Sequence, residues 1–316
     1  MSHSGPGCNA NGPLEEVPGL WFPADLVILQ AGTRIFRVFT TILKEKSPIF
    51  ADMFSIPQPP SASLEMFDGV PVVRIPDDPV ELEAFLKAIF DSEYFMRPPA
   101  VVRVEIAIGV LRLAHKYDVH YLRRRALQHL DTVYGRDSIS YPGRTIRASL
   151  ATIAVALEVG AKWLLPNAFY SLSEHAVKEV VMAGPAWDCL GASEKKNCLR
   201  VLLHKIQIHP ITEILSFLAI PTDEFSACED YKTCNTIRLY AIQVYPWSLH
   251  LDMFNAWGED DWDRTDGLCE PCLAEAKGAF QRGQQAFWND LPSVFDLPDW
   301  EQLEQMRRAA PAEVRT

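Results

Sequence analysis

The chain has 316 residues, of which 48% are hydrophobic and 22% charged. This balance is typical of a soluble globular protein and excludes the disordered, collagen-like and coiled-coil classes. Thirty basic and 41 acidic residues give a formal net charge of −11. Because this charge repels phosphate backbones and anionic lipids, neither nucleic acid nor a membrane surface is an expected partner. At about 150 residues per domain, the length predicts two modules, with one large module as the alternative.

The first seventeen residues lack the basic segment and apolar run of a signal peptide, so an intracellular protein is expected, in the nucleus or the cytoplasm. The longest apolar stretch, residues 148–165, is interrupted by Glu158 and Lys162. It is therefore not expected to cross a membrane. Seven cysteines in a chain of this length do not indicate a disulfide framework, which leaves reduced thiols or a metal site.

In chain order, residues 1–20 are rich in Gly, Asn, Ser and Pro and predict a flexible leader, with order beginning near Trp21. Residues 25–30 form a short apolar run, and residues 34–38 alternate charged and apolar side chains. Gly32 lies in the turn between them. This pattern predicts a β-hairpin.

Residues 39–54 then change to helical spacing. Because Pro48 interrupts this pattern, two short helices are predicted that meet at Ser47, which is a good helix N-cap. A loop rich in Pro and Ser follows at residues 57–63, and residues 70–75 predict a third strand.

A helix is predicted to begin at Pro79 and to present one apolar face as far as Phe90. Two more helices are expected at residues 102–117 and 121–134. Beyond a Ser-, Pro- and Gly-containing boundary at residues 137–144, only helical patterns occur. The predicted organisation is a flexible leader (residues 1–20), an α+β module (residues 21–135) and an all-helical C-terminal region (residues 145–316).

The α+β module resembles a BTB (POZ) domain over roughly 115 residues. The first part of the family pattern is an Asp, alternating apolar residues, a Phe two residues before a Val, and then Leu, Ser, Phe and Met-Phe. The second part lies in a later helical hairpin and includes an Ala, a Tyr and a Leu. The matching residues are Asp25, Val27, Leu29, Phe36, Val38, Leu43, Ser47, Phe50, Met53, Phe54, Leu113, Ala114, Lys116, Tyr117, Asp118, Val119, Leu122 and Ala126. One departure is Phe39, which stands where the family usually has His.

The resemblance implies a short three-stranded sheet with helical hairpins and a protein-interaction function without catalysis. The family's usual partners imply a homodimer, a cullin-type ubiquitin ligase or transcriptional corepressors. Many members pair by exchanging an upstream helix, but the leader before Trp21 has no amphipathic pattern. The C-terminal region is similar to the helical tails of BTB proteins from large fungal families, through Leu164-Leu165-Pro166 and the pair Cys269 and Cys272. The alternative function is an enzyme with its site in the C-terminal region.

Four cysteines form the strongest chemical pattern in the sequence. Cys269 and Cys272 make a Cys-x-x-Cys pair, and Cys228 and Cys234 supply a second pair with a longer gap. Four thiolates can hold a zinc ion tetrahedrally, and such an ion would have a structural role. The alternative is four reduced cysteines packed as small apolar side chains.

The sequence offers no catalytic residues of a recognised pattern. A nucleophile elbow and a phosphate-binding glycine loop are absent. The acidic segment 259–267 predicts a solvated loop, because Asp266 stands where a calcium-binding loop needs Gly.

Overall fold

A computed structural model describes residues 25–56, 65–138, 144–172, 175–207, 215–218, 227–244 and 257–310, without the side chains of residues 201–207. The predicted leader and Trp21 lie outside the described residues. Within the described ranges, no helix is both long enough and apolar enough to cross a membrane.

Contacts divide the chain into two compact units, residues 1–79 and residues 80–316. The boundary that the sequence predicts, at residues 137–144, lies inside the second unit. The helices that follow the sheet along the chain therefore share a compact unit with the C-terminal region.

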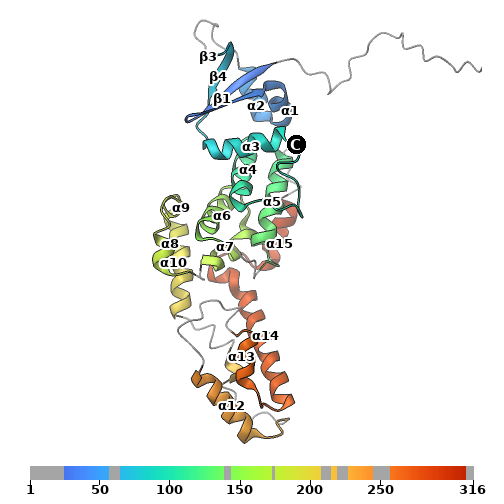
Figure 1. Cartoon of the computed structure of the whole chain (residues 1–316), viewed down its shortest axis with the longest axis vertical. Coiled ribbons are helices and arrows are strands. Elements are labelled where there is room, and N and C mark those ends of the chain that lie inside the picture. The colour runs from blue at the N-terminus through green and yellow to red at the C-terminus, as the bar shows by residue number, and fades with distance from the viewer. Residues whose placement is uncertain are drawn as a thin grey trace, which may run out of the picture. The chain divides into compact units, whose positions relative to one another are not determined.

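The first unit contains a mixed four-stranded sheet with the order β2-β1-β4-β3 (Figure 1). Its strands are β1 (Leu26–Ala31), β2 (Arg34–Phe39), β3 (Met66–Phe67) and β4 (Val70–Arg74). Strand β1 pairs antiparallel with β2 and parallel with β4, and β3 pairs antiparallel with β4. The predicted hairpin and third strand are confirmed. The expectation of three strands is wrong, because the short strand β3 adds a fourth.

A tight turn explains the additional strand. Asp68 and Gly69 connect β3 to β4 and have φ angles of +50° and +74°. Two consecutive residues with positive φ are characteristic of the hairpin turn for which Asp-Gly is a preferred sequence. The Asp-Gly pair was therefore the sequence signal for β3.

Two short helices follow β2, namely α1 (Thr40–Lys46) and α2 (Pro48–Ser55). The Ser47 hydroxyl accepts a hydrogen bond from the backbone N–H of Phe50 at 3.0 Å. This contact satisfies one of the N–H groups that the first turn of a helix leaves unpaired. The prediction of two helices that meet at Ser47 is confirmed.

Five helices dominate the part of the chain from Pro79 to Leu172. They are α3 (Pro79–Phe90), α4 (Val104–Lys116), α5 (His120–Tyr134), α6 (Ile146–Glu158) and α7 (Leu165–Leu172). Helices α4 and α5 pack on each other, and α6 packs on both α4 and α7 (Figure 1). The corner between α4 and α5 is Asp118, whose φ is +55°.

Polar contacts join α6 and α7 to the helices that precede them. Arg112 of α4 forms ion pairs with Glu81 of α3 and, at 3.0 Å, with Glu158 of α6. The buried hydroxyl of Ser149 contacts the hydroxyl of Tyr134 at 3.2 Å and accepts a hydrogen bond from Ser171 at 2.7 Å. These contacts explain why the second unit extends across the predicted boundary.

The described part of residues 144–310 contains helices and no strand, as the sequence predicts. Besides α6 and α7 it includes α8 (Val177–Val181), α9 (Pro185–Asp188), α10 (Ala192–Gln207), α12 (Tyr231–Val244), α13 (Glu259–Trp262), α14 (Glu270–Val294) and α15 (Trp300–Ala309). Short 3-10 helices occur at Lys162–Leu164, Ser216–Leu218 and Asp263–Thr265. The acidic segment is therefore helical over most of its length, and the loop expected there is wrong.

Candidate metal centre

The four cysteines come from the starts of two helices. Cys234 lies in the first turn of α12, and Cys228 lies just ahead of that helix. Cys269 is the N-cap residue of α14, and Cys272 lies in its first turn. The structure thus brings together the two pairs that the sequence singles out.

Asp230 organises the start of α12. Its carboxylate accepts hydrogen bonds from the backbone N–H of Thr233 at 3.1 Å and from the Thr233 hydroxyl at 2.7 Å. Its carbonyl oxygen accepts a bond from the N–H of Cys234 at 3.0 Å. An Asp at a helix start stabilises the first turn in this way. This turn brings Cys228 and Cys234 close together, although five residues separate them in the sequence.

A glycine turn leads into α14. Gly267 has a φ of +94°, and a Cβ atom there would lie 3.0 Å from Cδ1 of Ile237. Only glycine adopts this conformation without strain. Cys269 and Cys272, three residues apart at the helix start, then present their sulfurs toward the same side.

The four Sγ atoms all lie within 4.8 Å of one another. Four sulfurs at about 2.3 Å from a tetrahedrally bound ion would be about 3.8 Å apart, so only a small contraction would close the site. The sulfurs of Cys228 and Cys269 are 4.0 Å apart. The N–H of Cys269 also donates a hydrogen bond to Sγ of Cys234 at 3.4 Å.

Burial divides the cluster into two pairs. Cys234 and Cys272 are 1% and 0% exposed, whereas Cys228 and Cys269 are partly exposed. Burial raises the pKa values of the Cys234 and Cys272 thiols. Burial also acts to raise the pKa of Cys269, but hydrogen bonds from the backbone of Glu229 and Cys272 and from the neighbouring thiols lower it to about 7. A divalent cation would replace the remaining thiol protons, as metal binding to cysteines requires.

Aromatic side chains form the core around the two helices. Phe217 contacts the rings of Trp257, Trp262 and Phe280, with centroid separations of 5.6, 5.5 and 6.2 Å. The buried Arg238 of α12 donates a hydrogen bond to the carbonyl oxygen of Phe217 at 2.7 Å. This cluster fixes α12 and α14 against residues 216–218 and thereby positions the cysteines.

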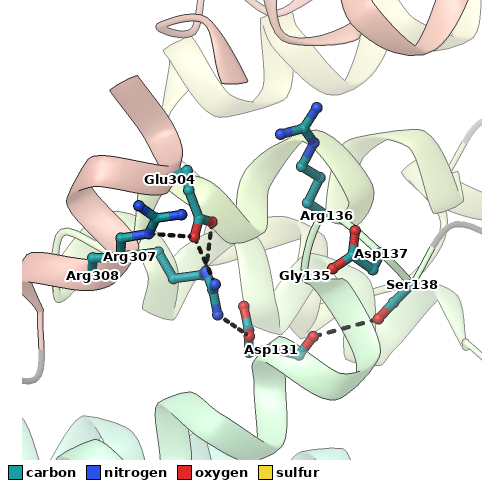
Figure 2. Close-up of a pocket in the computed structure, with 8 residues that line it drawn as sticks. All are labelled: Asp131, Gly135, Arg136, Asp137, Ser138, Glu304, Arg307 and Arg308. Carbon is teal, nitrogen blue, oxygen red and sulfur yellow. Dashed lines mark hydrogen bonds and ion pairs between the residues drawn. The ribbon is translucent and has the colours of Figure 1, made fainter. Parts of the chain in front are cut away.

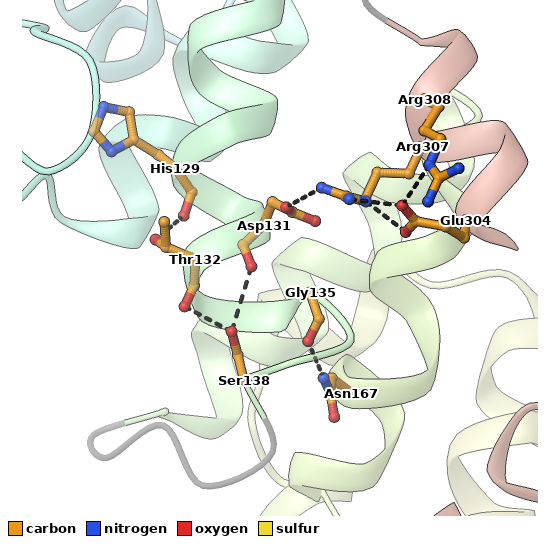
Figure 3. A network of polar contacts seen from close by, with 9 residues as sticks. All are labelled: His129, Asp131, Thr132, Gly135, Ser138, Asn167, Glu304, Arg307 and Arg308. Atoms are coloured by element: carbon orange, nitrogen blue, oxygen red, sulfur yellow. Dashed lines mark hydrogen bonds and ion pairs between the residues drawn. The ribbon is translucent and has the colours of Figure 1, made fainter. Parts of the chain in front are cut away.

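A second polar feature, which the sequence did not indicate, joins the C-terminal helix to α5. Arg307 of α15 binds Glu304 through two hydrogen bonds of 2.6 and 2.7 Å and Asp131 of α5 through one of 3.0 Å (Figure 3). Arg308 adds a 2.9 Å bond to Glu304. Burial raises the pKa of Asp131, while Arg307 acts to lower it.

A cavity of about 330 Å³ lies beside these ion pairs. Asp131, Gly135, Arg136, Asp137, Ser138, Glu304, Arg307 and Arg308 line it (Figure 2). Its guanidinium and carboxylate groups balance in number, and Arg307 binds two of the carboxylates. Because Arg307 pairs with both Asp131 and Glu304, the ion pairs on the cavity wall join α15 to α5.

The residues of the BTB-like pattern occupy packing positions. Leu43, Phe50, Ala114 and Leu122 are all 0% exposed, and Val27 and Tyr117 are also buried. Phe54 stacks on Phe50 with centroids 5.9 Å apart. Asp25 and Met53 are not in the core, and Phe36 and Val38 are half-buried in the edge strand β2. The pattern thus describes the interior of the sheet and helices more than their surface.

No protein-family model matches the chain, and none of the curated proteins compared with it matches either.

Proposed function

We propose that the protein is a protein-interaction adaptor with a BTB-type N-terminal region, and that a structural zinc ion stabilises its C-terminal helices. The order of motif residues along the chain supports the BTB part of this proposal. The burial of Leu43, Phe50, Ala114 and Leu122 agrees with the packing role that such a motif has. The interaction function rests on the surface of the sheet.

One face of the sheet exposes large apolar side chains, and this observation carries the adaptor proposal. Strand register places Ile35 and Phe39 of β2 on one face of the sheet, and Phe67 of β3 on the same face at the opposite edge. They are 48%, 48% and 50% exposed. Exposed large apolar side chains are a common feature of protein-binding sites. The expected occupant is another protein, either a second copy of this chain or a cullin-type scaffold.

Binding measurements on the full chain test this function. Light scattering should give a mass above that of the monomer, or titration with a purified cullin should give a saturable heat. Phe39→Ser should weaken whichever association occurs by at least about tenfold, because an exposed aromatic side chain contributes strongly to an interface. Leu239→Ser, which replaces a 58% exposed residue of α12, is the matched control. Equal effects of the two variants would contradict the proposed surface.

The zinc ion is proposed from the donor set. Four thiolate sulfurs that lie within 4.8 Å of one another favour zinc. A site with four protein ligands is structural because no position remains for water or substrate. Cys228 and Cys234 come from the start of α12, and Cys269 and Cys272 from the start of α14. The ion would therefore tie these two helices together at their N-terminal ends.

Metal analysis of freshly purified full-length protein tests the site. The expected content is about one zinc per chain. Cys272→Ser should reduce the content to near zero, whereas Cys189→Ser, at an exposed cysteine outside the cluster, should leave it unchanged. A content below about a tenth of an equivalent in the unaltered chain would contradict the zinc proposal and favour four packed thiols.

A further inference from the structure

The two pairs of cysteines differ in their access to solvent, and this difference bears on how the site responds to oxidants. Cys234 and Cys272 are buried, at 1% and 0% exposure. Cys228 and Cys269 are partly exposed, and their sulfurs are 4.0 Å apart. The outer edge of the cluster thus consists of two neighbouring sulfurs from different segments.

We propose that the cluster is a reversible redox switch, in which hydrogen peroxide joins Cys228 to Cys269 as a disulfide and releases the zinc ion. This inference rests on the proposed zinc site and adds its regulation. The order of reaction follows from access, since peroxide must approach the sulfur that it oxidises. Peroxide therefore reaches Cys228 and Cys269, the outer pair, first. Cys234 and Cys272, the buried inner pair, stay reduced.

The chemistry balances in two steps. A thiolate of the outer pair attacks peroxide, so that the O–O bond breaks, a sulfenic acid forms and hydroxide leaves. The second outer thiolate then attacks the sulfenic sulfur, forms the S–S bond and displaces a second hydroxide. Two thiolates are oxidised and one peroxide is reduced to two hydroxides, which take up protons to give two waters.

Loss of the outer pair removes two of the four ligands from the ion. The two inner thiolates that remain cannot complete a tetrahedral site, so zinc dissociates as they take up protons. The disulfide requires its two sulfurs to approach from 4.0 Å to about 2.05 Å. It joins the segment before α12 to the N-cap of α14, so the two helices remain linked while the ion is absent. A reducing thiol together with zinc would restore the original state.

Peroxide titration of the zinc-loaded full chain tests this switch. Zinc release is followed with a metal-sensitive dye, and the disulfide is identified by differential alkylation and peptide mass spectrometry. The expected result is one zinc released for each Cys228–Cys269 disulfide, with recovery of both on adding dithiothreitol and zinc. Cys189→Ser should behave identically, because Cys189 is an exposed thiol outside the cluster.

The outcomes separate this inference from the zinc proposal on which it rests. A chain that contains no zinc before oxidation contradicts the zinc site itself. A zinc-loaded chain that retains its metal while Cys189 is oxidised contradicts the switch alone. A first disulfide between Cys234 and Cys272 also contradicts it, since the inner pair would then be the more accessible.

Discussion

The helices α4 to α7 and the helices α12 to α14 belong to one compact unit, yet they are stabilised differently. Helix α4 buries seven of its thirteen residues, all but one of them apolar side chains and the other a glycine. Helix α12 buries three of its fourteen, and these are Cys234, Arg238 and Ala241. Burial of apolar area is the main favourable term in folding. Among the described residues, α12 therefore buries much less apolar surface than α4 does.

The difference indicates what the cysteine cluster contributes. A segment that buries little apolar surface commonly depends on a covalent or metal cross-link. Four sulfurs gather where α12 and α14 begin, next to the aromatic cluster around Phe217. The described residues of α4 to α7 contain no comparable cluster.

Removal of the metal should have the largest effect. Chelation of the zinc-loaded chain, or Cys272→Ser, should lower amide protection in α12 and the first turns of α14 by on the order of a hundredfold or more, because structural zinc can supply about 10 kcal/mol. Amides in α4 to α7 should keep their protection. The measurement is hydrogen exchange read by mass spectrometry.

Contacts near the C-terminal end of α14 predict how the loss of protection varies along this helix. Trp288 stacks on Trp300 with centroids 4.5 Å apart, and the Trp300 indole N–H donates a hydrogen bond to the carbonyl oxygen of Trp288 at 2.7 Å. Protection should therefore decrease from the end of α14 toward its start. Uniform loss across α4 to α7 as well would contradict the distinction between the two regions.

A cavity in the α4–α7 region should have the next largest effect. Leu130 of α5 is 0% exposed, and Leu130→Ala should lower the free energy of unfolding by about 2 to 5 kcal/mol. The zinc content should stay at that of the unaltered chain, because Leu130 lies in a different region from the cysteines. Chemical denaturation combined with metal analysis measures both quantities. A loss of zinc in the folded variant would show that the two regions depend on each other.

Local patterns in the sequence predicted most of the elements. The break at Pro48, the cap at Ser47 and the helix that begins at Pro79 each follow from the conformational limits of one or two residues. The cysteine cluster was also predictable, since metal ligands occur at characteristic spacings. Strand β3 was missed because two residues are too few for an alternating pattern, although Asp68-Gly69 marked its turn.

The ion pairs between α15 and α5 could not be predicted from spacing. Asp131 and Arg307 are 176 residues apart, and isolated charged residues carry no signal of their partners. The division into two units at Pro79 also depends on long-range contacts, so spacing in the sequence could not predict it. Arg112 links α4 to α6 across the predicted boundary, and such long-range contacts depend on the packing of whole helices.

Substitutions at two glycines should have smaller effects on stability, and these effects can be compared directly. Gly160 follows α6 and has a φ of +76°, with no atom within 4 Å of an added Cβ, whereas Gly267 has a φ of +94° and would also contact Ile237. Gly160→Ala should cost about 1 kcal/mol from backbone strain alone. Gly267→Ala should cost about 2 kcal/mol and, unlike its counterpart, weaken zinc binding. Equal zinc affinity in both variants would contradict the role given to the Gly267 turn.

The smallest expected effect concerns the ion pairs that hold α15 on α5. Hydrogen bonds from Arg307 lower the pKa of Glu304, so its ionised form stabilises the fold above the ordinary carboxyl pKa, and this contribution disappears as the pH falls through the lowered value. Because Arg307 is 41% exposed, solvent screening limits the loss in Glu304→Gln to under about 1 kcal/mol at pH 7. Thermal denaturation should show this difference narrowing toward zero below about pH 4. Asp290→Asn, at an exposed carboxyl of α14, is the control, and a pH-independent difference for Glu304→Gln would show that its charge does not hold α15.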